Sequence, residues 1–306
     1  MTETNILVEA EPTQPIQSQW RDVWLQFRSH PGAMIGMGFF LTVSLLVTVG
    51  PWVWTLDPAA PDILSRNQGP SWAHPMGTDQ LGRDTFAAML QGGRVSLLVG
   101  VTAMFLALVL GTLVGVLAGY FKRLDGFLMR LTDLFLALPL LPLLLVIIML
   151  WRDTLRAWLG PEMGVFLLIV FVIGITSWMQ TARIVRGDVL ALKEQEFIMA
   201  ARSIGTTPRR MINRHILPNV VSPIMVSATL GIANAIITES ALSFLGLGFP
   251  SDYPTWGKLL NDAVNFVQIH PERVLWPGAA ISLTVLSVNY IGDGLRDALD
   301  PRIRGR

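Results

Sequence analysis

The stretch from His74 to Asp84 carries the side chains best suited to chemistry in this chain. His74, Asp79 and Asp84 fall within one short stretch, and imidazole and carboxylate groups serve both as metal ligands and as acid–base groups. Their spacing matches no metal motif. An Asp placed before an apolar run is instead a common start of a helix. We therefore favour a capped turn that leads into a helix, and keep a metal or acid–base site as the alternative.

The rest of the chain offers little catalytic machinery. It has no cysteine, which excludes thiolate catalysis and Cys-ligated metals, and its four histidines share no local cluster. The phosphate-binding pattern G-x-x-x-x-G-K-[ST] does not occur, and the one Gly-Lys pair, Gly257-Lys258, is followed by Leu259. We predict no catalytic residue, no cofactor and no metal for this chain, which is therefore not itself an enzyme.

Glu239 is the one carboxylate next to the interior of a long apolar run. An acid at such a position is costly unless it is solvated or paired. Two interpretations stay open: Glu239 lies at the external membrane interface, or it lines a pathway. Asn234, in the same run, is the second candidate for a pathway or an external gate.

The elements that must hold these residues are membrane helices. Only 15% of the 306 residues are charged, against about 25% in soluble domains. Six uncharged, mainly apolar runs are long enough to cross about 30 Å of hydrocarbon, and helices satisfy the backbone there. We predict an all-α integral membrane protein with six spans, at about 33–56, 95–121, 131–151, 163–183, 217–240 and 274–293.

The charge pattern predicts the orientation of these spans. An even number places both termini on one side, and that side collects 16 of the 23 basic residues. The positive-inside rule then puts both termini in the cytoplasm. We therefore predict that residues 1–30 form a cytoplasmic tail and a lead-in to the first span, and that residues 57–93 form an external loop. A net charge of +1 argues against a nucleic-acid partner.

Small residues mark a packing face on the second span. Ala103, Ala107, Gly111, Gly115 and Gly119 recur at every fourth position, and such stripes let the backbones of membrane helices approach closely. We expect this stripe to lie against another helix, of this chain or of a partner.

Proline marks a weak point in the third span. Pro139 and Pro142 both fall within it, and an interior proline removes a ladder hydrogen bond. We expect a kinked or broken helix.

The segment 194–216 is polar and ordered in a chain that is otherwise apolar. Phe197, Ala200, Ala201 and Ile204 recur at helical spacing, which predicts a short helix with one small, apolar face. Gly205 occupies the position just after this helix, where a residue with positive φ is favoured. Thr207-Pro208 resembles the cap and first turn of a second helix.

This segment resembles the coupling motif of bacterial ABC importer permeases, written EAA-x3-G and followed by Ile/Leu-Pro. Ala200, Ala201 and Gly205 match it, whereas Met199 occupies the glutamate position. Two further stretches, His74–Asp84 and Ala241–Gly248, resemble the C-type permease subunit of the dipeptide, oligopeptide and nickel importer family. The resemblance covers most of the chain from Trp20 onward.

The resemblance implies a type I ABC importer permease fold over residues 31–306, in the bacterial cytoplasmic membrane and in contact with its lipid. It implies four kinds of contact: a homologous second permease, two ATPases that bind ATP and Mg, an extracytoplasmic substrate-binding protein, and lipid. The coupling helix would dock on an ATPase through Phe197, Ala200, Ala201, Ile204 and Gly205. Glu196 would then supply the acidic contact that Met199 lacks.

The function that follows is the translocation of di- or oligopeptides, with nickel complexes, glutathione or another small solute as alternatives. A secondary transporter or channel is less favoured, because such proteins place ionisable groups at mid-membrane. An intramembrane hydrolase would need a paired partner for His74 or Glu239. For the segment 194–216, the competing hypothesis is an amphipathic helix held on the anionic inner leaflet by its arginines.

Overall fold

The computed structural model describes residues 19–250 and 253–299. Over this range the chain is almost entirely helical, as predicted. Three short turns of other helix types (Ile63–Ser65, Ile212–Ile216 and Leu217–Asn219) and an isolated bridge between Thr78 and Asp84 accompany the helices. The α-helices are α1 (Gln19–Ser29), α2 (Pro31–Val53), α3 (Thr85–Tyr120), α4 (Lys122–Ala137), α5 (Leu140–Leu159), α6 (Pro161–Ile175), α7 (Trp178–Lys193), α8 (Glu196–Ser203), α9 (Pro208–Met211), α10 (Val221–Phe244), α11 (Trp256–Val264) and α12 (Glu272–Leu299).

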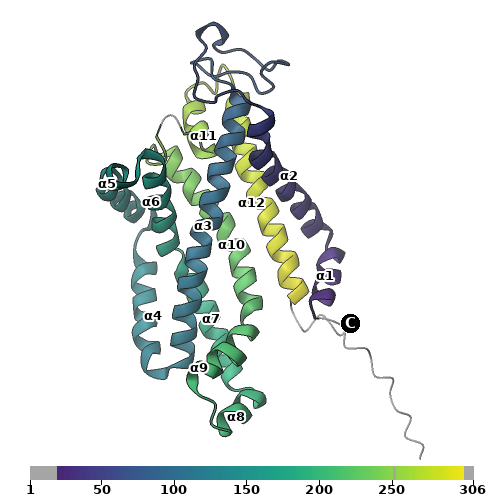
Figure 1. Ribbon diagram of the computed structural model, residues 1–306, viewed down its shortest axis with the longest axis vertical. Helices are drawn as coiled ribbons and strands as arrows, with labels where there is room; N and C mark the ends of the chain where they lie inside the picture. Colours follow the sequence, from purple (N-terminus) through teal and green to yellow (C-terminus); the bar gives the residue numbers. More distant parts are fainter. Residues whose placement is uncertain (1–18, 251–252, 300–306) are drawn as a thin grey trace, which may run out of the picture.

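The molecule is elongated and has two distinct ends (Figure 1). One, the loop end, carries the connection between α2 and α3 together with α11. The other, the α8 end, carries α8 and α9. Helix α3 runs between the two ends through the centre and packs against α2, α6, α7 and α10.

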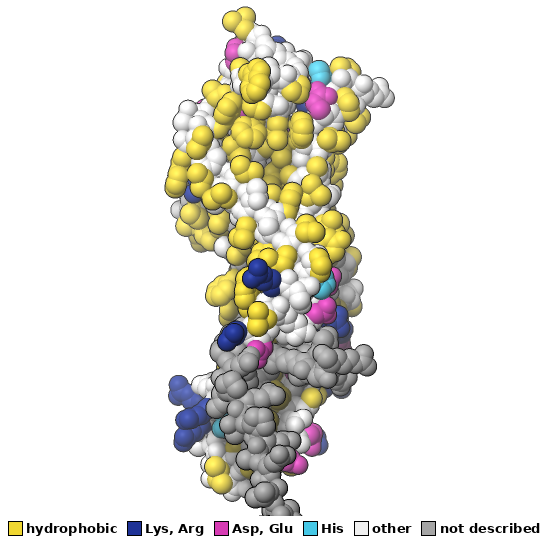
Figure 2. All heavy atoms as spheres, turned by 90° about the vertical axis from the view of Figure 1, so that its right-hand side faces the viewer, with side chains coloured by type: hydrophobic (Ala, Val, Ile, Leu, Met, Phe, Trp, Pro, Cys, Tyr) yellow, Lys and Arg dark blue, Asp and Glu magenta, His cyan; other side chains and the backbone are white. Residues whose placement is uncertain are grey.

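Five helical stretches are long and apolar enough to cross a membrane, and the pair α4 and α5 makes a sixth if it is taken as one bent span. The predicted span 163–183 corresponds to α6 and α7, which together reach from Pro161 to Lys193. Figure 2 shows a broad area of hydrophobic side chains in the upper half of the face formed by α2 and α12, with charged groups at the top of the view and from its middle downward. Such an area fits a lipid-facing surface.

The third predicted span, 131–151, is not one helix. The chain turns by 88° between α4 and α5. Pro139 keeps Leu138 out of the helical region, at φ −75° and ψ 137°. Pro142 causes no break because it lies in the first turn of α5, where the amide has no helical partner in any case.

The predicted loop 57–93 is too long. Helix α3 begins at Thr85, ahead of the predicted span 95–121, and so includes Arg94, which is exposed. The sequence argument used Arg94 as a boundary, but a charge does not end a helix when its side chain reaches solvent. The start is set by Asp84, whose carboxylate accepts a hydrogen bond from the amide of Ala87 at 2.6 Å.

The predicted tail falls only partly within the structure. Residues 1–18 and 300–306 lie outside the described residues, and so do both termini. Residues 19–29 form α1, whose Val23 and Phe27 are buried against Ala33 and Ala298. The lead-in is therefore a helix packed on α12.

Candidate functional site

A cavity of about 370 Å³ lies among α3, α4, α5, α7 and α10. Both breaks in the helical spans contribute to its wall: Leu138 comes from the turn between α4 and α5, and Thr176 and Ser177 separate α6 from α7. The hydroxyl of Thr176 donates to the carbonyl of Val172 at 2.7 Å, which offers the chain an alternative to the helical ladder at this point. Irregular backbone at membrane depth is typical where it lines a cavity.

The polar part of this wall is neutral. Among the described residues that line the cavity there is no Asp, Glu, Lys or Arg. The remaining lining is apolar and includes Met104, Phe135 and Ile184. The polar groups are hydroxyls and amides, from Thr176, Ser177, Gln180, Thr181, Ser227, Asn234 and Thr238.

The two residues proposed as a pathway or gate have different places. Asn234 is exposed and lines the cavity. Glu239 is fully buried and is not part of the cavity wall. In this structure the Glu239 side chain lies in the interior of the helix bundle and does not face the cavity.

Glu239 instead joins three helices near the loop end. Its carboxylate accepts hydrogen bonds from the hydroxyls of Ser96 in α3, at 2.8 Å, and Ser243 in α10, at 2.7 Å. The hydroxyl of Ser96 also accepts from the amide of Trp256, at 3.3 Å, where α11 begins. Gly257 touches Ser240 so closely that a Cβ on it would lie 2.2 Å from the Ser240 carbonyl oxygen. This buried cluster fixes α11 against α3 and α10.

The acidic and imidazole groups of the loop end build structure. Asp84 caps α3, lies 2.7 Å from Nδ1 of His74 and accepts from the indole of Trp54 at 3.1 Å. Asp79 caps a turn, accepting from the amides of Leu81 and Arg83. Within residues 19–250 and 253–299, no group of three or more His, Asp or Glu side chains is placed to hold a metal ion. The hydrogen bonds of Asp79 and Asp84 are those of a capped turn that leads into α3.

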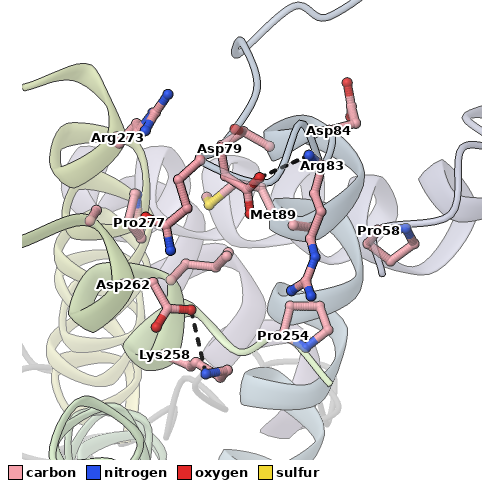
Figure 3. A pocket seen from close by; sticks show the side chains of 15 residues that line it. Pro58, Asp79, Arg83, Asp84, Met89, Pro254, Lys258, Asp262, Arg273 and Pro277 are labelled. Atoms are coloured by element: carbon pink, nitrogen blue, oxygen red, sulfur yellow. Dashed lines mark hydrogen bonds and ion pairs between the residues drawn. The ribbon is translucent and has the colours of Figure 1, made fainter. Parts of the chain in front are cut away.

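Charged side chains of both signs surround a second, small pocket at the loop end, of about 60 Å³ (Figure 3). Asp79 and Arg83 come from the loop, Lys258 and Asp262 from α11, and Arg273 from α12. Arg273 is nearly buried and donates to the carbonyl of Thr78 at 2.6 Å. Through this contact α12 holds the loop in place.

One carboxyl of the loop has a shifted pKa. The hydroxyl of Ser65, at 2.7 Å, and the amide of Leu64 both donate to Asp62. These hydrogen bonds favour the ionised form and lower the pKa of Asp62. The Asp62 carboxylate thus stays charged in the physiological range and holds the turn at Ile63–Ser65.

At the α8 end of the molecule, the chain leaves α8 through Gly205, which has the positive φ expected from the sequence. Its φ is +79°, a conformation that glycine adopts at little cost. The amide of Gly205 donates to Arg202 and that of Thr206 to Ala201, which is the hydrogen-bond pattern of a Schellman cap. Thr207 precedes Pro208 at the start of α9, although the Thr207 side chain makes no capping hydrogen bond.

The face of α8 differs in part from the prediction. Phe197 is 46% exposed, Ile204 is 84% exposed, and Ala200 and Glu196 also face outward. Ala201 is 7% exposed and packs inward, so the expectation that it meets a partner is wrong. The reason is geometric: one residue advances a helix by about 100°, which separates Ala201 from Ala200.

The inward side of α8 is anchored to the membrane helices. Ile198 and Ala201 share a buried cluster with Val116 of α3 and with Val185 and Val189 of α7. The ammonium group of Lys193, at the end of α7, donates to the last carbonyls of α3, those of Gly119 and Tyr120, at 3.1 Å each. Helix α8 is thus joined to the same ends of α3 and α7.

The stripe of small residues lies between α3 and α7. A Cβ on Gly111 would come within 2.7 Å of the carbonyl of Trp178. On Gly119 it would come within 2.7 Å of Val189 Cβ. Ala103 and Ala107 are fully buried on the same helix. The partner of the stripe is therefore a helix of this chain.

Two family models match the chain. Residues 107–305 match the model described as binding-protein-dependent transport system inner membrane component. Residues 18–70 match the model for the N-terminal transmembrane domain of oligopeptide transport permease C. The chain belongs to the family of binding-protein-dependent transport system inner membrane components. It is a multi-pass inner membrane protein and a permease subunit of an ABC transporter, not itself an ATPase.

Relatives with full-length similarity support this assignment. The chain is 40% identical over 288 residues to the dipeptide transport system permease protein DppC of Alkalihalophilus pseudofirmus, covering 94% of this chain and 91% of the relative. It is 37% identical over 289 residues to the oligopeptide transport system permease protein OppC of Bacillus subtilis, with coverages of 94% and 91%.

A solved structure shows the same fold at low sequence identity. It is the methionine ABC transporter MetNI, described as having inward facing conformations, with a TM-score of 0.54 and 16% identity. The match covers 69% of this chain and 96% of that one. The type I permease fold expected from the sequence is therefore confirmed.

Sequence reasoning missed most of the cavity wall. Thr176, Ser177 and Gln180 fall within the predicted span 163–183 and were assigned no role from the sequence. A signal was available: the pair Thr176-Ser177 interrupts a run of apolar residues, and such residues compete with the helical ladder.

Proposed function

We propose that this chain is the translocation subunit of an ATP-driven importer that takes up di- or oligopeptides delivered by an extracytoplasmic binding protein. The observation that supports this proposal most directly is the neutral, polar cavity at the two helix breaks. It occurs in a chain whose relatives are named as dipeptide and oligopeptide permeases. A second, homologous permease and two ATPases, which bind ATP and Mg, complete the assembly.

The α8 end is the cytoplasmic end in this proposal, and both termini lie on that side. The excess of basic residues supports this orientation. Phe197 and Ile204 then present an exposed apolar surface to the partner ATPases. Large exposed apolar side chains on a polar segment are typical of an interaction site.

The packing suggests how movement at α8 reaches the cavity. The cluster around Ile198 joins α8 to α3 and α7, and α3 and α7 are in close contact along the glycine stripe. These three helices therefore move as one body. Because α7 begins at Trp178, the break at Thr176-Ser177 would absorb the change in angle, right beside the cavity. A few residues at element ends commonly act as such a hinge.

The direct test is transport by the purified assembly. The complex that copurifies with this chain would be placed in proteoliposomes with its binding protein and a labelled tripeptide. We expect accumulation that requires this chain, ATP and the binding protein together. Uptake driven by an ion gradient without ATP would instead support a secondary transporter and refute the proposal.

A further inference from the structure

The cavity wall carries two exposed side-chain amides, those of Gln180 and Asn234. We propose that these two amides contact the backbone of the transported peptide. This inference rests on the proposed function. Because both side chains are uncharged, a carboxylate placed at either position should create a charge preference that these amides do not impose.

The two amides suit a ligand whose common feature is its backbone. Gln180 and Asn234 are both exposed and line the same cavity from different helices, α7 and α10. A side-chain amide offers two donor hydrogens and an acceptor oxygen, which matches the N–H and C=O groups that every peptide carries. Side-chain amides carry no net charge, so they add no preference among acidic, neutral and basic residues.

A further polar group on the same wall lacks a partner. Ser227 of α10 lines the cavity and is 8% exposed, and its hydroxyl makes no hydrogen bond to any described residue. The oxygen itself is buried in this structure, and a buried hydroxyl without a partner costs free energy. The exposed amide that α10 offers to a ligand is therefore that of Asn234.

The charged residues near the lining in sequence have partners outside the cavity wall. Glu239 follows the lining residue Thr238 but is fully buried, and its carboxylate accepts hydrogen bonds from Ser96 and Ser243. Arg183 follows the lining residue Thr181, and its guanidinium lies 2.5 Å from the carboxylate of Asp133 on α4. Arg186, on the same helix, makes two hydrogen bonds to Asp125, at 2.5 and 2.7 Å. Each of these cations is thus paired with an anion of α4, outside the cavity wall.

A charge-swap experiment on the complete transporter tests the proposal. Gln180→Glu and Asn234→Asp each introduce a carboxylate of nearly unchanged size at the cavity wall. Uptake would be measured in proteoliposomes for three tripeptides, Ala-Glu-Ala, Ala-Ala-Ala and Ala-Lys-Ala, at saturating binding protein. The matched control is Gln26→Glu, which makes the same chemical change on α1, away from the cavity.

We expect Gln26→Glu to keep the wild-type rate ratios among the three peptides, within about twofold. In Gln180→Glu and Asn234→Asp the rate ratio of acidic to basic peptide should fall at least about fivefold, because a fixed charge in a partly desolvated site repels like charge. Rate ratios that stay at the wild-type value in both cavity variants would overturn the inference. Absence of all peptide uptake in the wild type would refute the proposed function instead.

A variant without charge separates the amide contact from the charge effect. Asn234→Leu keeps the wall neutral but removes the hydrogen-bonding group. We expect uptake of all three peptides to fall in parallel, with their ratios unchanged. Full uptake in Asn234→Leu, with normal amounts of the complex, would show that the amide does not contact the peptide backbone.

Discussion

The contact between α3 and α7 gives a stability prediction with a built-in control. In Gly115→Ala the new methyl carbon would lie 2.7 Å from the carbonyl oxygen of Ala182 and 2.8 Å from Cβ of Val185. Neither atom can rotate away, because one belongs to the backbone and the other is fixed to it. The helices must separate, and overpacking of this kind costs about 1–3 kcal/mol.

The control is a glycine on the partner helix itself. Gly187 lies in α7, and a Cβ there would meet no atom within 4 Å. Replacing a helical glycine with alanine gains about 0.5–1 kcal/mol from backbone entropy in both variants, so this gain cancels in the comparison. The difference in stability between Gly115→Ala and Gly187→Ala should equal the overpacking cost of about 1–3 kcal/mol.

Denaturant titration of the purified chain in detergent, followed by tryptophan fluorescence, measures this difference. We expect Gly187→Ala to be as stable as the wild type or more stable, and Gly115→Ala to be less stable. Gly115→Leu should be less stable still and should reduce transport. If Gly115→Ala and Gly187→Ala unfold at the same denaturant concentration, the stripe is not the α3–α7 contact and the packing argument fails.

Three further predictions concern the loop end and the orientation. Glu239→Leu leaves the hydroxyls of Ser96 and Ser243 without their acceptor and should lower stability by about 1–3 kcal/mol per hydroxyl; an unchanged thermal midpoint would contradict the buried cluster. Asp84→Ala removes the cap of α3 and should cost about 0.5–2 kcal/mol in the same assay, whereas wild-type stability would show that the cap is dispensable. A single cysteine at Arg209 should resist an impermeant thiol reagent added outside intact cells, and labelling from outside would reverse the orientation.

Much of the fold could be predicted because membrane insertion leaves few alternatives. A long run without charge must form a helix in lipid, so the number of spans followed from counting charges. The glycine stripe could be identified for a similar reason: every fourth position on a helix falls on nearly one face, whatever the neighbour is. The sequence could not say which neighbour, and the structure shows α7.

The parts that could not be predicted depend on contacts between distant residues. Glu239 was interpreted from its distance along one helix, but its environment comes from Ser96, which lies 143 positions away in the chain. Ala201 was assigned to the partner-facing side because it matches the coupling motif beside Ala200 and shares the predicted apolar face. Only the cluster with Val116 and Val185 distinguishes the inward side.

Coupling through α8 is the central claim, and its outward apolar residues test it most directly. In the reconstituted complex, ATP hydrolysis would be measured with and without peptide-loaded binding protein for Phe197→Asp and Ile204→Asp. The reference variants Arg209→Glu and Arg210→Glu test the alternative that α8 is held on anionic lipid. All four positions are exposed, so the fold should persist.

The account predicts that Phe197→Asp and Ile204→Asp assemble in the membrane in normal amounts, yet lose both the stimulation of hydrolysis by loaded binding protein and the uptake of peptide. The arginine variants should retain most of both activities. The coupling role assigned to α8 would be contradicted if the Phe197 and Ile204 variants kept full stimulation of ATP hydrolysis while the arginine variants lost both that stimulation and peptide uptake.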